Sequence, residues 1–177
     1  MSRATREDKR KNVIEALNRA KALELQAIHQ YMYQHYQLDD LDFGELAGNL
    51  KLIAIDEMRH AEALAERIKE LGGDPTMVAA GPVVKGQSVE EIFAFNAEQE
   101  DEAMEIYNTF VAVCKENGDV QSARLFEMII EHEQIHFTHF DNILEHMKTL
   151  GAAYLARIAG TAATTGPAKG FAYPAQA

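Results

Sequence analysis

Two stretches of the sequence resemble each other: IDEMRHA at residues 55 to 61 and EHEQIH at residues 131 to 136. In each stretch a glutamate is followed three residues later by a histidine, first as Glu57 and His60 and then as Glu133 and His136. Residues three apart lie on one face of an α-helix, so each pair presents a carboxylate beside an imidazole. Either pair alone is typical of a solvent-exposed helix face, and the rest of the sequence decides whether both are buried instead.

The sequence around these pairs predicts long amphipathic helices, because apolar residues recur at spacings of three and four. Helix-breaking glycine and proline gather at 71 to 88 (LGGDPTMVAAGPVVKGQS), at 116 to 119 (ENGD) and after Leu150. We therefore expect helices at about 6 to 37, 41 to 71, 88 to 117 and 120 to 150, with a short fifth helix at about 151 to 160.

The lengths of these helices and of their connections indicate an all-α fold. A helix of roughly 30 residues is about 45 Å long, which suits a four-helix bundle. The links after the first and third helices are short. The link after the second is long and contains Pro and Gly, as a crossover from one end of the bundle to the other requires.

Local signals predict two helix starts and the extent of the domain. Asp40 and Ser88 precede the second and third helices as candidate N-caps, and Glu91 would complete a capping box with Ser88. Residues 1 to 160 then form one domain. The segment 161 to 177, TAATTGPAKGFAYPAQA, consists largely of small residues, and we expect an irregular tail without packed structure.

Composition narrows the range of partners and compartments. The chain has 177 residues, enough for one domain with its own core, and a net charge of −11, which favours cations over nucleic acid. The single cysteine, Cys114, excludes an internal disulfide and fits a reducing compartment. The charged start MSRATREDKRKN does not resemble a signal peptide or a membrane anchor, so we expect a cytoplasmic protein with no membrane partner.

Each of the four long predicted helices carries charged residues in the middle of its apolar stripe. The interrupting residues are Glu24 in the first helix, Glu57 and His60 in the second, Glu100 in the third, and Glu133 and His136 in the fourth. Buried carboxylates are costly, and four of them would also repel one another. Two divalent cations would neutralise the four carboxylates, and each imidazole would add one nitrogen ligand. Carboxylate and imidazole ligands in this arrangement are typical of two-metal sites in helix bundles.

The chain also repeats itself. Glu24 and Glu100 are 76 residues apart (100 − 24), and the same offset relates Glu57 to Glu133 (133 − 57), His60 to His136, and Tyr31 to Tyr107. A two-helix unit has therefore been used twice. The repeat predicts a pseudo-two-fold axis that passes between the two metals.

These residues resemble those of the bacterioferritins, haem-containing members of the ferritin family, over the chain up to about residue 158. The similar stretches are ELQAIHQY at 24 to 31, IDEMRHA at 55 to 61, VEEIFAFNAEQE at 89 to 100, and EHEQIH at 131 to 136. The resemblance implies a ferritin-like fold and a di-iron site. It implies that Glu57 and Glu133 bridge the two irons, that Glu24 and Glu100 are terminal ligands, and that His60 and His136 each complete one iron.

The resemblance gives Met58 a role as well. Met58 follows Glu57 and so points away from the interior of its own bundle. Bacterioferritins place a methionine here on a dimer two-fold axis, where two copies ligate one haem iron. From the residues alone, Met58 would be an ordinary interface methionine. Tyr31 would lie near the di-iron ligands as a hydrogen-bonding or redox side chain, or simply as a core tyrosine.

Three positions depart from the pattern of the family. Leu52 stands where some members carry a histidine that binds iron on the inner surface, and His139 takes the place of a tryptophan found in some members. His132 stands where an Asp commonly precedes the second motif's Glu, whereas its repeat partner Asp56 keeps the acid. Such residues form the hydrogen bonds that orient a ligand imidazole.

The function implied by the resemblance is iron storage and detoxification. A ferroxidase would oxidise Fe(II) to Fe(III) with O2 or peroxide and store it as mineral inside a hollow homo-oligomer. The resemblance implies a 24-mer built from dimers, with the fifth helix at four-fold channels, and leaves room for a redox donor protein. Two alternatives remain: a non-storing di-metal oxidase or peroxidase, like rubrerythrin without its rubredoxin domain, and a haem redox protein with a vestigial metal site.

Overall fold

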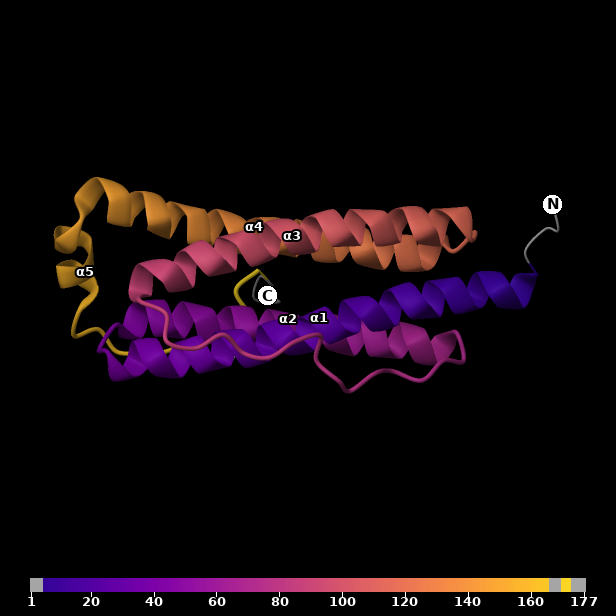
Figure 1. Ribbon diagram of the computed structural model, residues 1–177, viewed down its shortest axis with the longest axis horizontal. Coiled ribbons are helices and arrows are strands. Elements are labelled where there is room, and N and C mark those ends of the chain that lie inside the picture. Colours follow the sequence, from indigo (N-terminus) through magenta and orange to yellow (C-terminus); the bar gives the residue numbers. More distant parts are fainter. Residues whose placement is uncertain (1–4, 166–169, 173–177) are drawn as a thin grey trace, which may run out of the picture.

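The computed structural model describes residues 5–165 and 170–172, and these form five helices and no strand. The helices are α1 (Arg6–Asp40), α2 (Gly44–Glu70), α3 (Val89–Glu116), α4 (Val120–Leu150) and α5 (Ala152–Ile158). α1 packs along α2 and α3 packs along α4, and the two pairs join into a four-helix bundle (Figure 1). α5 lies across one end. The predicted all-α bundle, with its crossover and its short fifth helix, is confirmed.

One of the two predicted N-caps is correct. Ser88 caps α3 in a full capping box: its hydroxyl accepts the N–H of Glu91, whose carboxylate accepts the N–H of Ser88. The prediction for Asp40 was wrong. Asp40 is the last residue of α1, which contains no breaking residue before it, and the chain turns through Asp42 at φ 65° before α2 begins. Phe43 at the N-cap of α2 provides no side-chain cap.

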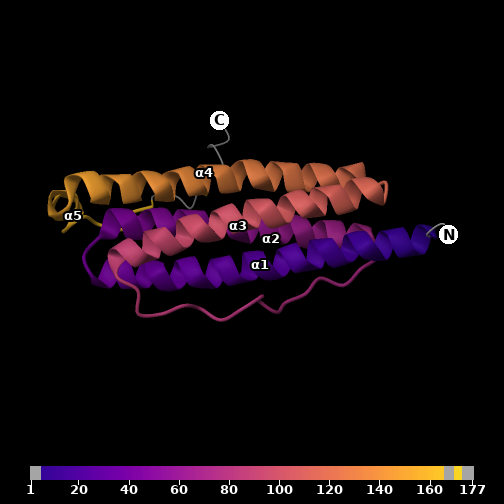
Figure 2. The same cartoon turned by 45° about the horizontal axis from the view of Figure 1, so that its top comes forward.

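The long connection between α2 and α3 is held against α1 along its length (Figure 2). The side chain of Asn18 accepts the N–H of Thr76 at 2.7 Å, and Lys21 donates to the carbonyl of the same residue at 2.7 Å. Further along, the amide of Gln30 bonds both the N–H and the C=O of Val84. These bonds satisfy backbone groups that a segment without secondary structure leaves free.

The described part of the tail has no helix or strand, but it is packed, so the expectation of an unpacked tail was wrong for these residues. Phe43 and Thr161 form an isolated parallel bridge, and the Thr161 hydroxyl accepts the N–H of Glu45. Gly44 permits this approach, because a Cβ there would overlap the backbone at Thr161. Phe171 packs against the apolar core. The predictions for 166–169 and 173–177 lie outside the described residues.

The apolar core is divided into two clusters. One contains Leu17, Leu64 and Phe126, and the other contains Ile53 and Phe140 among its members. Every long helix contributes to both clusters, and the polar residues that interrupt its stripe lie between the two contributions. The bundle thus encloses a charged layer midway along its axis. Among the described residues, none of the helices combines the length and the apolar character that a membrane span requires.

The capping box at the start of α3 yields a test of the fold. Replacing Ser88 with Ala removes the acceptor for the N–H of Glu91 and should cost about 1 kcal/mol of unfolding free energy. For a chain of this size the melting temperature should fall by about 2–4 °C, measured by calorimetry on the metal-free protein. The matched control is Thr109→Ala, at an exposed position of α3 away from its N-terminus, which should not lower the melting temperature. Equal melting temperatures for Ser88→Ala and the parent protein would contradict this role.

Candidate metal centre

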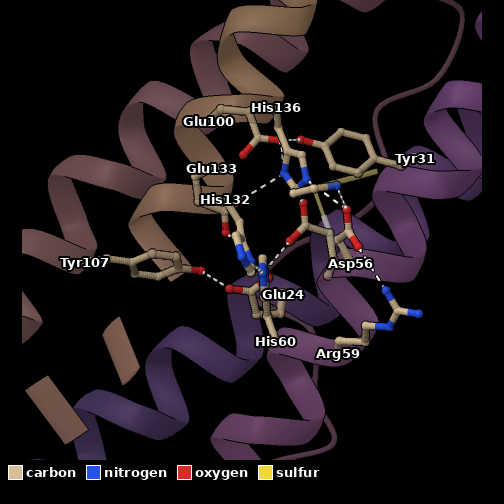
Figure 3. Close-up of polar contacts among 12 residues, drawn as sticks. Glu24, Tyr31, Asp56, Arg59, His60, Glu100, Tyr107, His132, Glu133 and His136 are labelled. Carbon is tan, nitrogen blue, oxygen red and sulfur yellow. Dashed lines mark hydrogen bonds and ion pairs between the residues drawn. The ribbon is translucent and has the colours of Figure 1, made fainter. Parts of the chain in front are cut away.

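The charged layer brings all six predicted residues together. Glu24 comes from α1, Glu57 and His60 from α2, Glu100 from α3, and Glu133 and His136 from α4 (Figure 3). None of the six is more than 3% exposed. Because the Glu-x-x-His spacing keeps both side chains of a pair on one helix face, α2 and α4 each supply a carboxylate and an imidazole.

The six residues form two overlapping groups, each with ligand atoms within 4.8 Å of one another. One group contains Glu24, Glu57, His60 and Glu133, and the other contains Glu57, Glu100, Glu133 and His136. Glu57 and Glu133 belong to both groups. Three carboxylates and one imidazole in each group form a donor set that suits Fe, Mn or Zn. The residues present therefore fit two metal ions that share two carboxylates.

Both imidazoles direct the same nitrogen toward the carboxylates. Nδ1 of His60 lies 2.9 Å from Glu57 and 3.3 Å from Glu133, and Nδ1 of His136 lies 2.9 Å from Glu133 and 3.3 Å from Glu57. The terminal glutamates are farther away, with Glu24 at 3.6 Å from His60 and Glu100 at 3.8 Å from His136. Nδ1 is thus the nitrogen that a metal in each group would meet.

The outer nitrogens of the two imidazoles have different partners. Nε2 of His136 lies 3.3 Å from the Asp56 carboxylate, whereas Nε2 of His60 lies 3.0 Å from Nδ1 of His132. Both contacts cross between the two repeated halves of the chain. The departure seen at His132 therefore replaces a carboxylate with an imidazole behind one of the two histidines, which makes the surroundings of the two groups unequal.

Two tyrosine hydroxyls hold the outer glutamates. Tyr31 donates to Glu100 at 2.5 Å, and Tyr107 donates to Glu24 at 2.5 Å (Figure 3). The structure thus places Tyr31 against a predicted ligand rather than merely near the cluster. Tyr107 was not assigned a role from the sequence, although the 76-residue offset from Tyr31 was a signal for it. A donated hydrogen bond fixes the orientation of a carboxylate that would otherwise rotate.

Burial and mutual repulsion shift the outer glutamates toward the protonated form. Burial, together with the neighbouring carboxylate of Glu57, raises the pKa of Glu24 to about 7. Burial, followed by the carboxylates of Glu133 and Glu57, holds the pKa of Glu100 well above the usual carboxyl range. Without added positive charge, the four buried carboxylates therefore do not all ionise. This is the electrostatic property expected of a site that binds cations.

The pKa values of the histidines and of the shared glutamates shift in the direction opposite to the effect of burial. Burial favours a neutral imidazole, yet the carboxylate of Glu133 raises the pKa of His60 well above its ordinary value, and that of Glu57 does the same for His136. Burial likewise opposes ionisation of Glu57 and Glu133, but the adjacent histidines hold the pKa of each below its usual value. In the absence of metal, the positive charge beside the shared carboxylates thus comes from protonated imidazoles. Bound metal ions would supply that positive charge instead.

A cavity of about 70 Å³ lies between α1 and α3 and reaches the cluster. Its lining includes all four glutamates together with apolar side chains such as Leu23 and Ile106. A volume of this size can hold more than one water-sized ligand. The metal groups therefore adjoin a space in which a small oxidant could reach them.

Met58 lies outside this layer, as its position after Glu57 predicts. It is 55% exposed and lines a surface hollow of about 490 Å³ formed by α1, α2 and the crossover segment. Met77 lines the same hollow and is 78% exposed. A thioether is a donor that haem iron accepts, and Met58 is the residue of this hollow to which the resemblance assigns that role.

Comparison with known proteins identifies the family. The family model of the ferritin-like domain matches residues 14–150. The bacterioferritin of Desulfovibrio desulfuricans is 62% identical over 167 residues, which cover 94% of this chain and 93% of that protein. The bacterioferritin of Mycolicibacterium paratuberculosis is 35% identical over 139 residues, covering 78% of this chain and 87% of that protein.

Solved structures agree. The X-ray structure of the D. desulfuricans bacterioferritin, described by its diiron site in different catalytic states, has a TM-score of 0.92 and 61% identity and covers 96% of this chain and 99% of its own. The Mycobacterium tuberculosis bacterioferritin has a TM-score of 0.79 at 33% identity, covering 83% and 93% respectively. With the two-metal arrangement of glutamates and histidines already in place, these similarities mean that the chain belongs to the bacterioferritins, within the ferritin-like family.

Proposed function

We propose that the chain is a ferroxidase that oxidises Fe(II) to Fe(III) and stores it as mineral in a hollow homo-oligomeric shell. The observation that carries the proposal is the pair of overlapping ligand groups that share Glu57 and Glu133. Family membership supports it, since relatives at 62% and 35% identity are bacterioferritins and the D. desulfuricans structure is described with a diiron site. Two Fe(II) would each give one electron to O2 or peroxide.

The residues divide into roles by their position. Glu57 and Glu133, present in both groups, would bridge the two irons, while Glu24 and Glu100 would each bind one as a terminal ligand. His60 and His136 would each complete one iron through Nδ1. The Tyr31 and Tyr107 hydroxyls would hold the terminal carboxylates in place.

Storage requires an assembly, and we propose a 24-mer built from dimers, with α5 at its four-fold channels. The net charge of −11 supports a role that draws in cations. A separate redox protein would supply the electrons that release stored iron. We place the protein in the cytoplasm, supported by its single, buried cysteine.

Size-exclusion chromatography tests storage directly. A species of shell size that gains an iron core after exposure to Fe(II) in air is the expected result. A monomer or dimer that oxidises Fe(II) without retaining it would instead favour the non-storing oxidase or peroxidase.

Removing one ligand should stop the fast oxidation. Glu57→Ala and His136→Ala each delete a group that would bind iron, and the initial rate of Fe(III) formation should fall by more than ~100-fold, beyond the usual cost of changing an outer-shell partner. Glu66→Ala on α2 and His146→Ala on α4 remove the same residue types from exposed positions and should retain the parental rate. Parental rates in the ligand variants would contradict the site assignment.

The protonation of the layer predicts how stability depends on pH. The pKa of Glu24 is about 7 in the folded protein against an ordinary 4.5, so its stabilising proton is lost as pH rises through about 7. The raised pKa values of His60 and His136 act in the same direction above pH 6.5. Glu57 and Glu133, with lowered pKa values, contribute stability above pH 4.5 that is lost only as the pH falls below that value, so they do not alter the trend near neutral pH.

The melting temperature of the metal-free protein should therefore fall between about pH 6 and pH 8. Because metal ions displace these protons, Zn²⁺ should raise the melting temperature more at pH 8 than at pH 6. Calorimetry at both pH values, with and without zinc, measures the difference. A zinc-induced increase that is equal at both values would show that metal binding does not displace these protons.

Met58 and Met77 allow the haem proposal to be tested with a matched pair. Both line the same hollow, but only Met58 is proposed as the axial ligand across a dimer two-fold axis. Met58→Ala should give assembled protein without haem absorbance, and Met77→Ala should keep the parental spectrum. A haem spectrum unchanged in Met58→Ala would exclude the axial role, and its loss in Met77→Ala alone would move the ligand to that residue.

A further inference from the structure

Lys21 is a buried, charged side chain of α1 that the proposed ferroxidase chemistry does not use. It is only 4% exposed. Its ammonium donates to the carbonyl of Thr76 at 2.7 Å and lies 3.5 Å from Sδ of Met77. Both acceptors belong to the crossover segment, which runs along α1 (Figure 2). Lys21 therefore joins α1 to the crossover through a charged group.

The positive charge of Lys21 has no matching negative charge in the part of the chain that the structure describes. An ammonium has three N–H donors, and its two acceptors here, a carbonyl and a thioether, are both neutral. None of the described carboxylates pairs with it, and burial lowers the pKa of the amine. Since buried charges are normally paired, Lys21 has both a free donor and an unmatched charge to offer an anion.

Lys21 lines the same hollow of about 490 Å³ as Met58. Apolar side chains form most of the remaining wall, namely Ala61, Ala65 and Pro75. The hollow thus combines a thioether, an apolar wall and a buried ammonium. An iron porphyrin has a feature to match each of them: an iron that accepts a thioether, an apolar ring, and carboxylates at the edge of the ring.

Glu62 is the other charged residue that lines this hollow. Its side chain is exposed, so its carboxylate is solvated and its repulsion of an anion is screened by water. The charge of Lys21 is largely shielded from water, and its attraction is screened less. The hollow should therefore favour an anionic group on the side of Lys21.

We propose that Lys21 binds a carboxylate of the porphyrin whose iron Met58 ligates, so that the hollow recognises haem by the edge of its ring as well as by its iron. The proposal rests on the haem site proposed above. A hydrogen bond between an ammonium and a carboxylate is about twice as strong as one between neutral groups. A contact of this kind should change the affinity about 10–100-fold.

The test compares haem with its dimethyl ester, in which the two carboxylates lose their charge while the iron and the ring are kept. Each porphyrin is titrated into haem-free, assembled protein, and binding is followed by absorbance. Lys21→Met removes the charge, Lys21→Gln keeps an N–H donor for the carbonyl of Thr76, and Lys21→Arg keeps the charge. The matched control is Lys11→Met, which removes a largely exposed lysine of the same helix.

The parent protein, Lys21→Arg and Lys11→Met should each bind haem about 10–100-fold more tightly than the ester. Lys21→Met and Lys21→Gln should bind haem and the ester with affinities that agree within about 3-fold, because the charge that distinguishes them is gone. The comparison within each variant cancels any general effect of the substitution on the crossover.

Equal affinities of the parent protein for haem and the ester, or a preference for haem that persists in Lys21→Met, would overturn the role of Lys21. A similar loss of both porphyrins in Lys21→Met would limit that residue to anchoring the crossover, which also contradicts the proposal. Failure of the haem site itself is a separate result: Met58→Ala would then bind both porphyrins as the parent protein does.

Discussion

The burial of four glutamates between two apolar clusters is the constraint on which the rest of this structure depends. Such a layer is unfavourable unless each carboxylate is protonated, hydrogen-bonded or matched by positive charge. The protein uses all three: burial raises the pKa of Glu24 to about 7, tyrosine hydroxyls donate to Glu24 and Glu100, and the imidazoles pair with the shared carboxylates. Two metal ions would replace the protons and meet the same electrostatic requirement.

The contacts around this layer also join the two repeated halves of the bundle. Tyr31, in the first half, bonds Glu100 in the second, and Tyr107 in the second bonds Glu24 in the first. The outer nitrogens of His60 and His136 likewise meet residues of the opposite half. Apolar packing in both core clusters also joins the two helix pairs, and these buried polar contacts add a fixed register between them.

The two-fold symmetry of the ligands does not extend to their surroundings. Asp56 and His132 occupy equivalent places in the repeat, yet one is a carboxylate held by the tail and the other is an imidazole stacked on His60. The outer nitrogens of the two histidines therefore have chemically different partners, although their inner nitrogens lie at matching distances from the shared glutamates.

The sequence by itself determined the helices, the crossover and the six clustered residues, because periodicity, breaking residues and the 76-residue repeat are all local or internal patterns. The family followed from the same motifs. The sequence did not reveal that Asp56 lies behind His136 rather than His60, or that Phe171 packs on that side. It also placed the N-cap of α2 at Asp40, whereas α2 begins at Gly44 after Phe43. Tertiary structure decided these points, because a repeat shows which residues are equivalent, whereas only packing shows which residues from distant segments come into contact.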